Sequence, residues 1–275
     1  MNEKSVKVNG VNMRWLEKGN GEPVVFIHGL PTSPDLWRYV VPELTNKKRI
    51  AWEMIGYGSS IEEGRHRDIS IGHQAAYLAS WLDAMDYQKV TLVGHDLGGG
   101  VAQIIATLRP NIVQGLVLVN SICYDSWPIP RVKALRALGP VAERFPNTAV
   151  RLAMQTFLQE GHVDNERAEE SMNYFWKHYE HINAAEAIIR QLRYLDVKDT
   201  MAISHMLPDI KVPSRVVWGA SDHFQTIDYG NRLARDLNAP IDRIEGGKHF
   251  VPIDYPKHVA KAVEEVLKEQ IFAKG

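Results

Sequence analysis

The chain of 275 residues contains one cysteine, Cys123, and no apolar run long enough to span a bilayer. A single cysteine cannot form an intrachain disulfide, so the sequence excludes a disulfide-stabilised fold and fits a reducing compartment. The N-terminus also lacks the apolar core of a signal peptide. From these absences we expect a cytoplasmic protein with no membrane partner.

Excess charge is almost absent as well, because 32 basic and 33 acidic residues give a net charge of −1 at pH 7. A chain without a basic excess is not expected to bind nucleic acid. The sequence contains no His-Glu-x-x-His zinc motif, no P-loop and no dinucleotide-binding fingerprint, so we expect neither a metal nor a cofactor. It is compatible with a monomer or a homodimer.

What the chain does contain is 45% hydrophobic residues, many of them in short apolar runs separated by helical patterns. This alternation predicts a largely parallel sheet of about eight strands with helices on both faces. A hairpin is expected at 5–18, around Asn9-Gly10. Further strands are expected at 23–29, 49–54, 90–94, 113–120, 214–219 and 241–246, and helices near 70–86, 98–108, 228–237 and 256–272.

The middle of the chain breaks this alternation. From about Tyr124 to Met206 no strand pattern occurs, and the block is rich in aromatic residues. We therefore predict an all-helical cap at 124–206, inserted into a core formed by 1–123 and 207–275. An apolar, aromatic cap favours a small hydrophobic substrate. The aromatic side chains expected to contact it are Trp37, Tyr124, Trp176 and Phe250.

The stretch Gly94-His95-Asp96-Leu97-Gly98 has the spacing of a nucleophile elbow, in which the central residue lies on a sharp strand-to-helix turn. Most elbows carry serine, whereas this one carries Asp96. A carboxylate is anionic at neutral pH without help from a base. Its attack on an ester would give a reactive anhydride, whereas attack on a saturated carbon gives an ordinary ester. The alternative interpretation is that Asp96 only caps the following helix.

Two polar residues follow late strands of the predicted sheet. Asp222 comes after the strand that ends at Gly219, and His249 comes after the next strand. Open α/β sheets place their sites at the carboxyl ends of the strands, so both side chains are expected near Asp96. Asp125, after the preceding strand, is the rival candidate for the acid that orients His249.

His28-Gly29-Leu30-Pro31 matches the H-G-x-P motif, and together with the Asp96 elbow it makes the chain resemble the aspartate-nucleophile branch of the α/β-hydrolase fold family. That branch contains epoxide hydrolases and haloalkane dehalogenases. The resemblance implies a triad of Asp96, His249 and Asp222. It also implies an oxyanion hole made by the backbone N–H groups of Leu97 and Leu30.

Within this branch, the sequence favours an epoxide hydrolase over a dehalogenase. The usual halide donors of dehalogenases are a tryptophan after the nucleophile and an asparagine in H-G-x-P, but this chain has Leu97 and Leu30, which cannot donate from their side chains. Cap residues Trp176 and His178 are the remaining candidates for that role. Epoxide hydrolases use cap tyrosines as acids, and the resemblance points to Tyr194 as one. The other is less defined, with Tyr174, Tyr179 and Tyr124 as candidates.

The expected reaction is therefore the opening of an epoxide to a vicinal diol, through an ester on Asp96 that is hydrolysed by water activated by His249. The first alternative is a haloalkane or haloacid dehalogenase that uses the same nucleophile. Two further alternatives are an ester or lactone hydrolase with Asp96 as a base, and a hydrolase-like binding protein without catalytic activity.

Overall fold

The computed structural model describes residues 1–272. Its centre is an eight-stranded sheet in the order β1-β2-β4-β3-β5-β6-β7-β8, in which only the β1–β2 and β2–β4 pairs are antiparallel. The predicted mostly parallel sheet is confirmed. The strands are β1 (Asn2–Val8), β2 (Val11–Lys18), β3 (Pro23–Ile27), β4 (Lys48–Trp52), β5 (Val90–Asp96), β6 (Val113–Ser121), β7 (Ser214–Gly219) and β8 (Ile241–Ile244).

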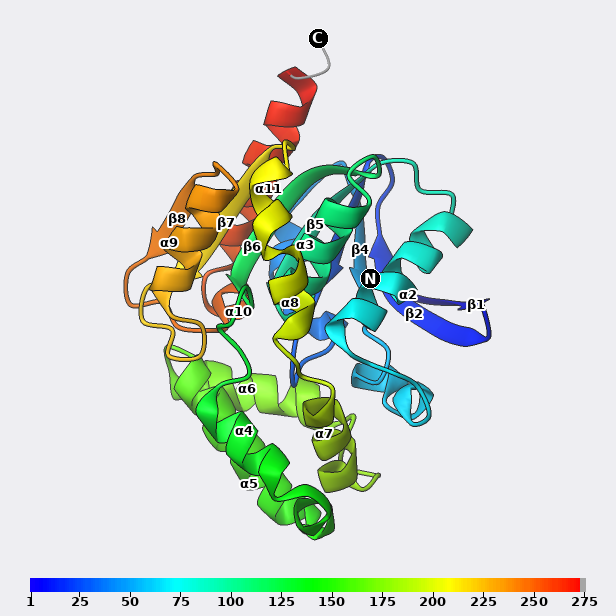
Figure 1. The fold of residues 1–275 in the computed structure, drawn as a ribbon, viewed down its shortest axis with the longest axis vertical. Helices are drawn as coiled ribbons and strands as arrows, with labels where there is room; N and C mark the ends of the chain where they lie inside the picture. The colour runs from blue at the N-terminus through cyan, green and yellow to red at the C-terminus, as the bar shows by residue number, and fades with distance from the viewer. Residues whose placement is uncertain (273–275) are drawn as a thin grey trace.

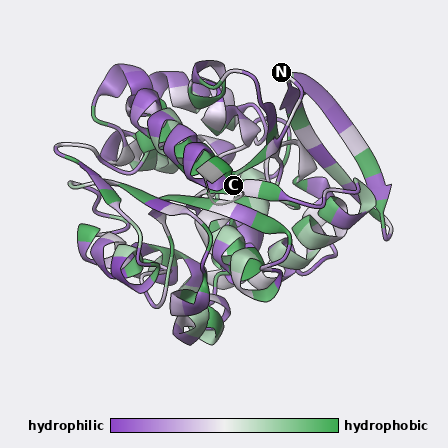
Figure 2. Ribbon diagram, turned by 90° about the horizontal axis from the view of Figure 1, so that it is seen from above, coloured by the Kyte–Doolittle hydropathy of each residue, from purple (hydrophilic) through white to green (hydrophobic). Residues whose placement is uncertain are grey.

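Helices cover both faces of the sheet (Figure 2). Alternate side chains of each strand point to opposite faces, so Val25 and Ile27 pack into one apolar core while Val24 and Phe26 pack into the other. The first core is covered by α2 (Ile71–Ala84), α3 (Leu97–Leu108), α8 (Lys198–Ile203), η5 (Ser204–Asp209) and α9 (Ile227–Asp236). The second is covered by η1 (Pro34–Trp37), α1 (Val40–Glu43), α10 (Val251–Asp254) and α11 (Pro256–Phe272).

Between β6 and β7, the described chain forms only helices. Most of them gather at one end of the sheet, below the carboxyl ends of its parallel strands, whereas α8 runs beside α3 (Figure 1). This segment contains α4 (Pro130–Ala137), η4 (Gly139–Arg144), α5 (Asn147–Gly161), α6 (Asn165–Trp176) and α7 (Ala184–Arg193). Short 3-10 turns after β4 complete the described chain, η2 (Gly58–Ser60) and η3 (Glu62–Gly64).

None of the helices in residues 1–272 is long and apolar enough to cross a bilayer. The same residues contain no group of three or more histidine, cysteine or acidic side chains placed to hold a metal ion.

Candidate active site

Asp96 lies at the turn from β5 to α3, with φ 51° and ψ −121°. A side chain rarely adopts this left-handed backbone, and such strain is typical of an elbow that pushes one residue out of the sheet. The turn is this tight because glycine flanks it. A Cβ on Gly98 would overlap the backbone carbonyl of Ile27, and one on Gly94 would lie 2.5 Å from the carbonyl oxygen of Gly98.

The Asp96 carboxylate is held by two backbone amides. The N–H of Leu30 donates to Oδ2 over 3.0 Å, and the N–H of Leu97 donates to the same carboxylate. Gly29 has room for no side chain, because a Cβ there would overlap Asp96 Oδ2. The loop after β3 can therefore bring its amide against the carboxylate only if residue 29 is glycine.

The other carboxylate oxygen of Asp96 faces an imidazole. Nε2 of His249 lies 4.0 Å from Asp96 Oδ1, which is too long for a direct hydrogen bond. The opposite ring nitrogen, Nδ1, lies 2.8 Å from Oδ2 of Asp222. This contact fixes Nδ1 as the protonated nitrogen of the neutral ring and leaves Nε2 as a base that faces Asp96.

Both carboxylate oxygens of Asp222 accept further hydrogen bonds. Its Oδ1 accepts the backbone N–H groups of Phe224, over 2.7 Å, and of Gln225, over 3.1 Å, while the Asn120 amide donates to Oδ2 over 2.7 Å. Asn120 is the second-last residue of β6, which neighbours β7 in the sheet, so the topology brings it beside the loop that carries Asp222. These hydrogen bonds favour a charged carboxylate at this buried position.

Burial and charge act in opposite directions on the two central groups. Burial raises the pKa of Asp96 above its usual value, although His249 and the amides of Leu97 and Leu30 oppose the rise. Burial alone would lower the pKa of His249, but the charge and hydrogen bond of Asp222, together with the charge of Asp96, raise it overall. The two groups therefore stabilise each other's charged forms.

A cavity of about 50 Å³ opens beside Asp96 and His249. Its walls come from both the core and the helical segment, and they are almost entirely apolar. The polar lining side chains besides that pair are Trp127 and Gln225, and the Trp127 indole N–H already donates to Thr200 Oγ1 over 2.8 Å. The apolar lining residues are Leu30, Leu97, Ile122, Pro128, Ile129, Val132, Phe157, Leu195 and Phe224.

This geometry allows a defined set of chemical steps. Oδ1 of Asp96 lies toward His249 and is free to act on a small molecule, while Oδ2 accepts the N–H of Leu30, a donor that would also stabilise an oxyanion at the same place. His249 Nε2 is placed to take a proton from water on that side. Such an arrangement is suited to making and then hydrolysing an ester on Asp96.

Comparison with known proteins agrees with the fold. A family model described as the alpha/beta hydrolase fold matches residues 22–256. The chain belongs to the α/β hydrolase fold family. This assignment covers every strand from β3 to β8 and includes Asp96, Asp222 and His249.

Relatives of this α/β hydrolase carry more than one activity in their names. A haloalkane dehalogenase of Agrobacterium fabrum is 33% identical over 114 residues, which is 41% of this chain and only 37% of that protein. Epoxide hydrolase 2 of Caenorhabditis elegans is 23% identical over 98% of this chain and 81% of its own. A solved α/β hydrolase fold protein from Burkholderia ambifaria superposes with a TM-score of 0.83 at 22% identity, covering 95% and 97% of the two chains.

The structure brings together five residues that were predicted from the sequence: Asp96, His249, Asp222, Leu97 and Leu30. The rival acid, Asp125, is exposed and accepts a hydrogen bond from the Tyr229 hydroxyl instead. Asp222 is therefore the carboxylate that meets His249 in this α/β hydrolase.

The two predicted cap tyrosines do not line the cavity. Tyr174 is 37% exposed, and its ring packs under the Arg38 guanidinium 4.3 Å away and near Lys177. Tyr194 follows α7 as its C-cap and packs against the core on the side of α2, where its charge acts on Tyr77. The positions predicted for both side chains need this correction, because helical spacing does not reveal which side of the cap faces Asp96.

The four aromatic residues expected at the substrate also lie outside the cavity wall. Trp37 is fully buried against Phe26, and Tyr124 turns to Asp236, to which its hydroxyl donates over 2.7 Å. Trp176 stacks on Tyr179. Phe250 packs edge-on against the ring of His249, 5.1 Å between centroids, so it supports the histidine from behind.

Three residues that do shape the site were missed: Asn120, Trp127 and Gln225. Asn120 lies near the end of the strand that precedes the cap in the sequence, but placing it beside the strand before Asp222 requires the order of strands in the sheet. Gln225 lies three residues after Asp222, but nothing in its local sequence distinguishes it from a loop residue. Trp127 follows β6 closely and could be found only by knowing how the chain enters the cap.

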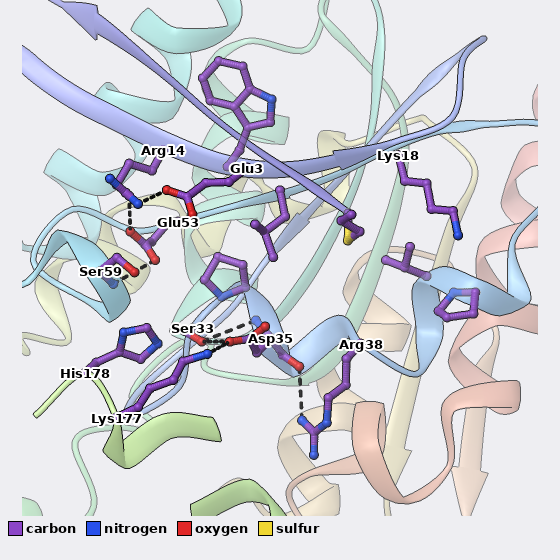
Figure 3. Close-up of a pocket in the computed structure, with 16 residues that line it drawn as sticks. Glu3, Arg14, Lys18, Ser33, Asp35, Arg38, Glu53, Ser59, Lys177 and His178 are labelled. Carbon is purple, nitrogen blue, oxygen red and sulfur yellow. Dashed lines mark hydrogen bonds and ion pairs between the residues drawn. The ribbon is translucent and has the colours of Figure 1, made fainter. Parts of the chain in front are cut away.

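A larger hollow of about 470 Å³ lies elsewhere, between β2, η1 and the end of α6, and contains neither Asp96 nor His249 (Figure 3). Its charges are largely paired, with Lys177 on Asp35 at 2.7 Å and Arg14 beside Glu53 at 3.7 Å. Glu53 also accepts the Ser59 N–H over 2.9 Å, so it closes the turn after β4. We therefore place the candidate site at the smaller, apolar cavity.

Proposed function

We propose that this α/β hydrolase displaces a leaving group from a saturated carbon and then hydrolyses the resulting ester on Asp96. The observation that carries the proposal is that the two oxygens of the Asp96 carboxylate have different neighbours. Oδ2 accepts the N–H of Leu30, whereas Oδ1 lies toward His249; the Leu97 amide also acts on the carboxylate. We further propose residues 124–206 as the cap over a core of residues 1–123 and 207–275.

In the first step, Asp96 Oδ1 attacks the substrate carbon and the leaving group departs with the bonding electrons. In the second step, His249 Nε2 takes a proton from water, and the hydroxide attacks Cγ of Asp96. The negative charge then develops on Oδ2, where the Leu30 amide already donates, with the Leu97 amide beside the same carboxylate. One such donor typically lowers a barrier by about 3–4 kcal/mol.

The composition of the cavity wall bears on the leaving group. An epoxide oxygen must gain a proton as its ring opens, and no tyrosine is among the cavity-lining residues of the described chain. A halide leaves as a stable anion and needs no proton. We therefore propose a short alkyl halide as the first substrate class, which reverses the preference drawn from the sequence.

Hydrolysis of a small epoxide is the second candidate. It is favoured by Tyr57 and Tyr179, which are both buried, with Tyr57 close enough to Asp96 that the carboxylate charge helps to raise its pKa. The Tyr57 hydroxyl is buried without a hydrogen-bond partner in residues 1–272. A shift of the cap that opened the cavity toward this pair would supply the acid that an epoxide requires.

The same geometry argues against an ester or lactone hydrolase in which Asp96 acts as a base. Acyl transfer needs an empty oxyanion hole for the substrate's carbonyl oxygen. Here the Leu30 amide already donates to Asp96 Oδ2, and the Leu97 amide acts on the same carboxylate. A binding protein without activity would not need the strained backbone of Asp96 or the buried contact between His249 and Asp222.

The test is a screen of the His249→Gln variant with short alkyl bromides and with propylene oxide, followed by intact-protein mass spectrometry. We expect the ester to accumulate, because the first step needs no base and the second does. The matched control is Asp96→Asn, which should gain no mass. If His249→Gln turned over normally, or gained no mass with any substrate that the unmodified protein hydrolyses, the proposal would be wrong.

A further inference from the structure

Gln225 is the one cavity-lining residue whose polar end has no assigned task. The side chain is 3% exposed, and its Oε1 is buried without a hydrogen-bond partner among residues 1–272. A buried polar group without a partner costs stability, so a protein keeps one where it serves a ligand or a reaction. The cavity beside Asp96 is the space that this amide borders.

The backbone of Gln225 is fixed on both sides. Its N–H donates to Asp222 Oδ1 over 3.1 Å, and its carbonyl accepts the indole N–H of Trp218 over 2.8 Å. The loop that positions the acid of the Asp222–His249 pair therefore also positions the amide. The side-chain torsions then decide whether the oxygen or the N–H group of the amide meets a molecule in the cavity.

The cavity offers no competing donor for a departing anion. The Leu30 amide donates to Asp96 Oδ2, the Leu97 amide acts on the same carboxylate, and the Trp127 indole N–H donates to Thr200. With a volume of about 50 Å³, the cavity also keeps a small ligand in reach of all its walls.

We infer that the side-chain amide of Gln225 donates a hydrogen bond to the leaving atom of the substrate as Asp96 displaces it. This inference rests on the proposed function. Asp96 Oδ1 supplies an electron pair to the carbon, and the carbon–halogen bond breaks with its own pair to give a halide that accepts the Gln225 N–H. With an epoxide the accepting atom is the ring oxygen, which stays on the carbon chain and takes its proton from water.

The test uses Gln225→Met, which keeps the length of the side chain and removes the amide. In the His249→Gln background, single-turnover ester formation is followed by mass spectrometry with 1-chloropropane, 1-bromopropane and 1-iodopropane, and with propylene oxide. We expect the chloride to react on the order of 100-fold more slowly than with Gln225 present. The iodide should be slowed least, because it is the weakest hydrogen-bond acceptor of the three.

Thermal unfolding separates this role from a structural one. Gln225→Met removes an unpartnered buried amide and leaves both backbone contacts, so we expect an unchanged or higher unfolding temperature. Gln270→Met is the matched control, since Gln270 is also buried with an unpartnered Oε1, but its Nε2 donates to Thr91 Oγ1 and neither residue lines the cavity. That variant should unfold at a lower temperature and keep the leaving-group dependence unchanged.

Each outcome has a defined meaning. If Gln225→Met slows all the halides equally, or lowers the unfolding temperature as Gln270→Met does, the inference is wrong and Gln225 is structural. If the epoxide alone forms an ester and Gln225→Met slows it, the leaving atom is oxygen and the role of the amide stands. If no substrate forms an ester with Gln225 intact, the proposed function itself fails, before the variant is compared.

Discussion

His249 faces two carboxylates, Asp222 and Asp96, and only Asp96 becomes an ester in the proposed cycle. Asp222 forms no covalent bond in the proposed cycle, and two backbone amides and Asn120 hold its carboxylate in place. Asp96 loses its charge when it becomes an ester. Since both charges raise the pKa of His249 against the lowering effect of burial, the basicity of the ring changes during turnover.

A pH dependence follows, and its sign is fixed by the neutral form of His249 being the base. Activity should rise with pH through the raised pKa of His249 and be lost below it. In the ester, the charge of Asp96 is gone, so the pKa of His249 should be lower than in the free enzyme. We expect the acidic limb of single-turnover ester hydrolysis to lie at lower pH than the titration of His249 in the resting enzyme, measured by NMR. Coincident midpoints would contradict this account.

The hydrogen bond from Asn120 to Asp222 leads to a prediction about how Asp222 is oriented. Replacing Asn120 with alanine removes the donor to Asp222 Oδ2 and leaves a buried carboxylate oxygen with one contact fewer. We expect Asn120→Ala to lower the stability by about 1–3 kcal/mol and to slow ester hydrolysis more than ester formation. Asn120→Asp would place a second carboxylate beside Asp222 and should be worse on both counts. Equal slowing of both steps by Asn120→Ala would argue for a general structural effect.

Residue types and spacing were enough to predict Asp96, Asp222, His249 and the two amide donors, because each follows a recognisable strand or turn. The tyrosines were not predictable in the same way. The direction of Tyr194 and Tyr174 depends on how the helices of the cap sit over the core, and this depends on many weak apolar contacts rather than on any motif. Gln225 was not predicted, because a single amide side chain in a loop belongs to no recognisable sequence motif.

At the scale of elements, the end of α5 is attached directly to the loop that carries His249. The N–H of Phe250 donates to the carbonyl of Gly161 over 3.1 Å, and a Cβ on Gly161 would lie 2.5 Å from the ring of Phe250. Beside this contact, His162 and Asp254 form a fully buried pair at 2.6 Å. The end of α5 and the loop of His249 therefore share one packed junction.

Gly161→Ala should push the Phe250 ring toward His249. Overpacking of this kind costs about 1–3 kcal/mol. We expect a lower unfolding temperature and a slower second step, because the displaced ring bears on the histidine and not on Asp96. Gly139→Ala is the control, since Gly139 also lies in the cap but has nothing within 4 Å of the added carbon. Its positive φ still carries a backbone cost, so stability and rate are compared separately.

The strands and the helices of the core were predictable because apolar periodicity is strong there, and all eight strands lie where the sequence indicates. The helical segment was predicted only as helical. Its individual helices are short or half-exposed, and α4 has no fully buried residue, so its periodicity carries little information about packing.

At the scale of the molecule, the volume beside Asp96 limits what can react. Phe157 is a cap residue that lines the cavity and stacks on Phe224 with 4.5 Å between ring centroids. We expect Phe157→Ala to raise the preference for a hexyl over a propyl substrate by about 10-fold or more, since each accommodated methylene contributes about 1–3 kcal/mol. Phe145→Ala, at an exposed cap phenylalanine, should leave the preference unchanged. The measurement is the ratio of kcat/KM values.

The backbone amides beside Asp96 also bear on which reaction this fold can carry out. A serine at residue 96 would be too short to reach the amides of Leu30 and Leu97, and the vacated pair would be open to the carbonyl oxygen of an incoming acyl compound. In this scaffold, reaction at a tetrahedral carbon and reaction at a trigonal one are thus separated by the reach of a single side chain.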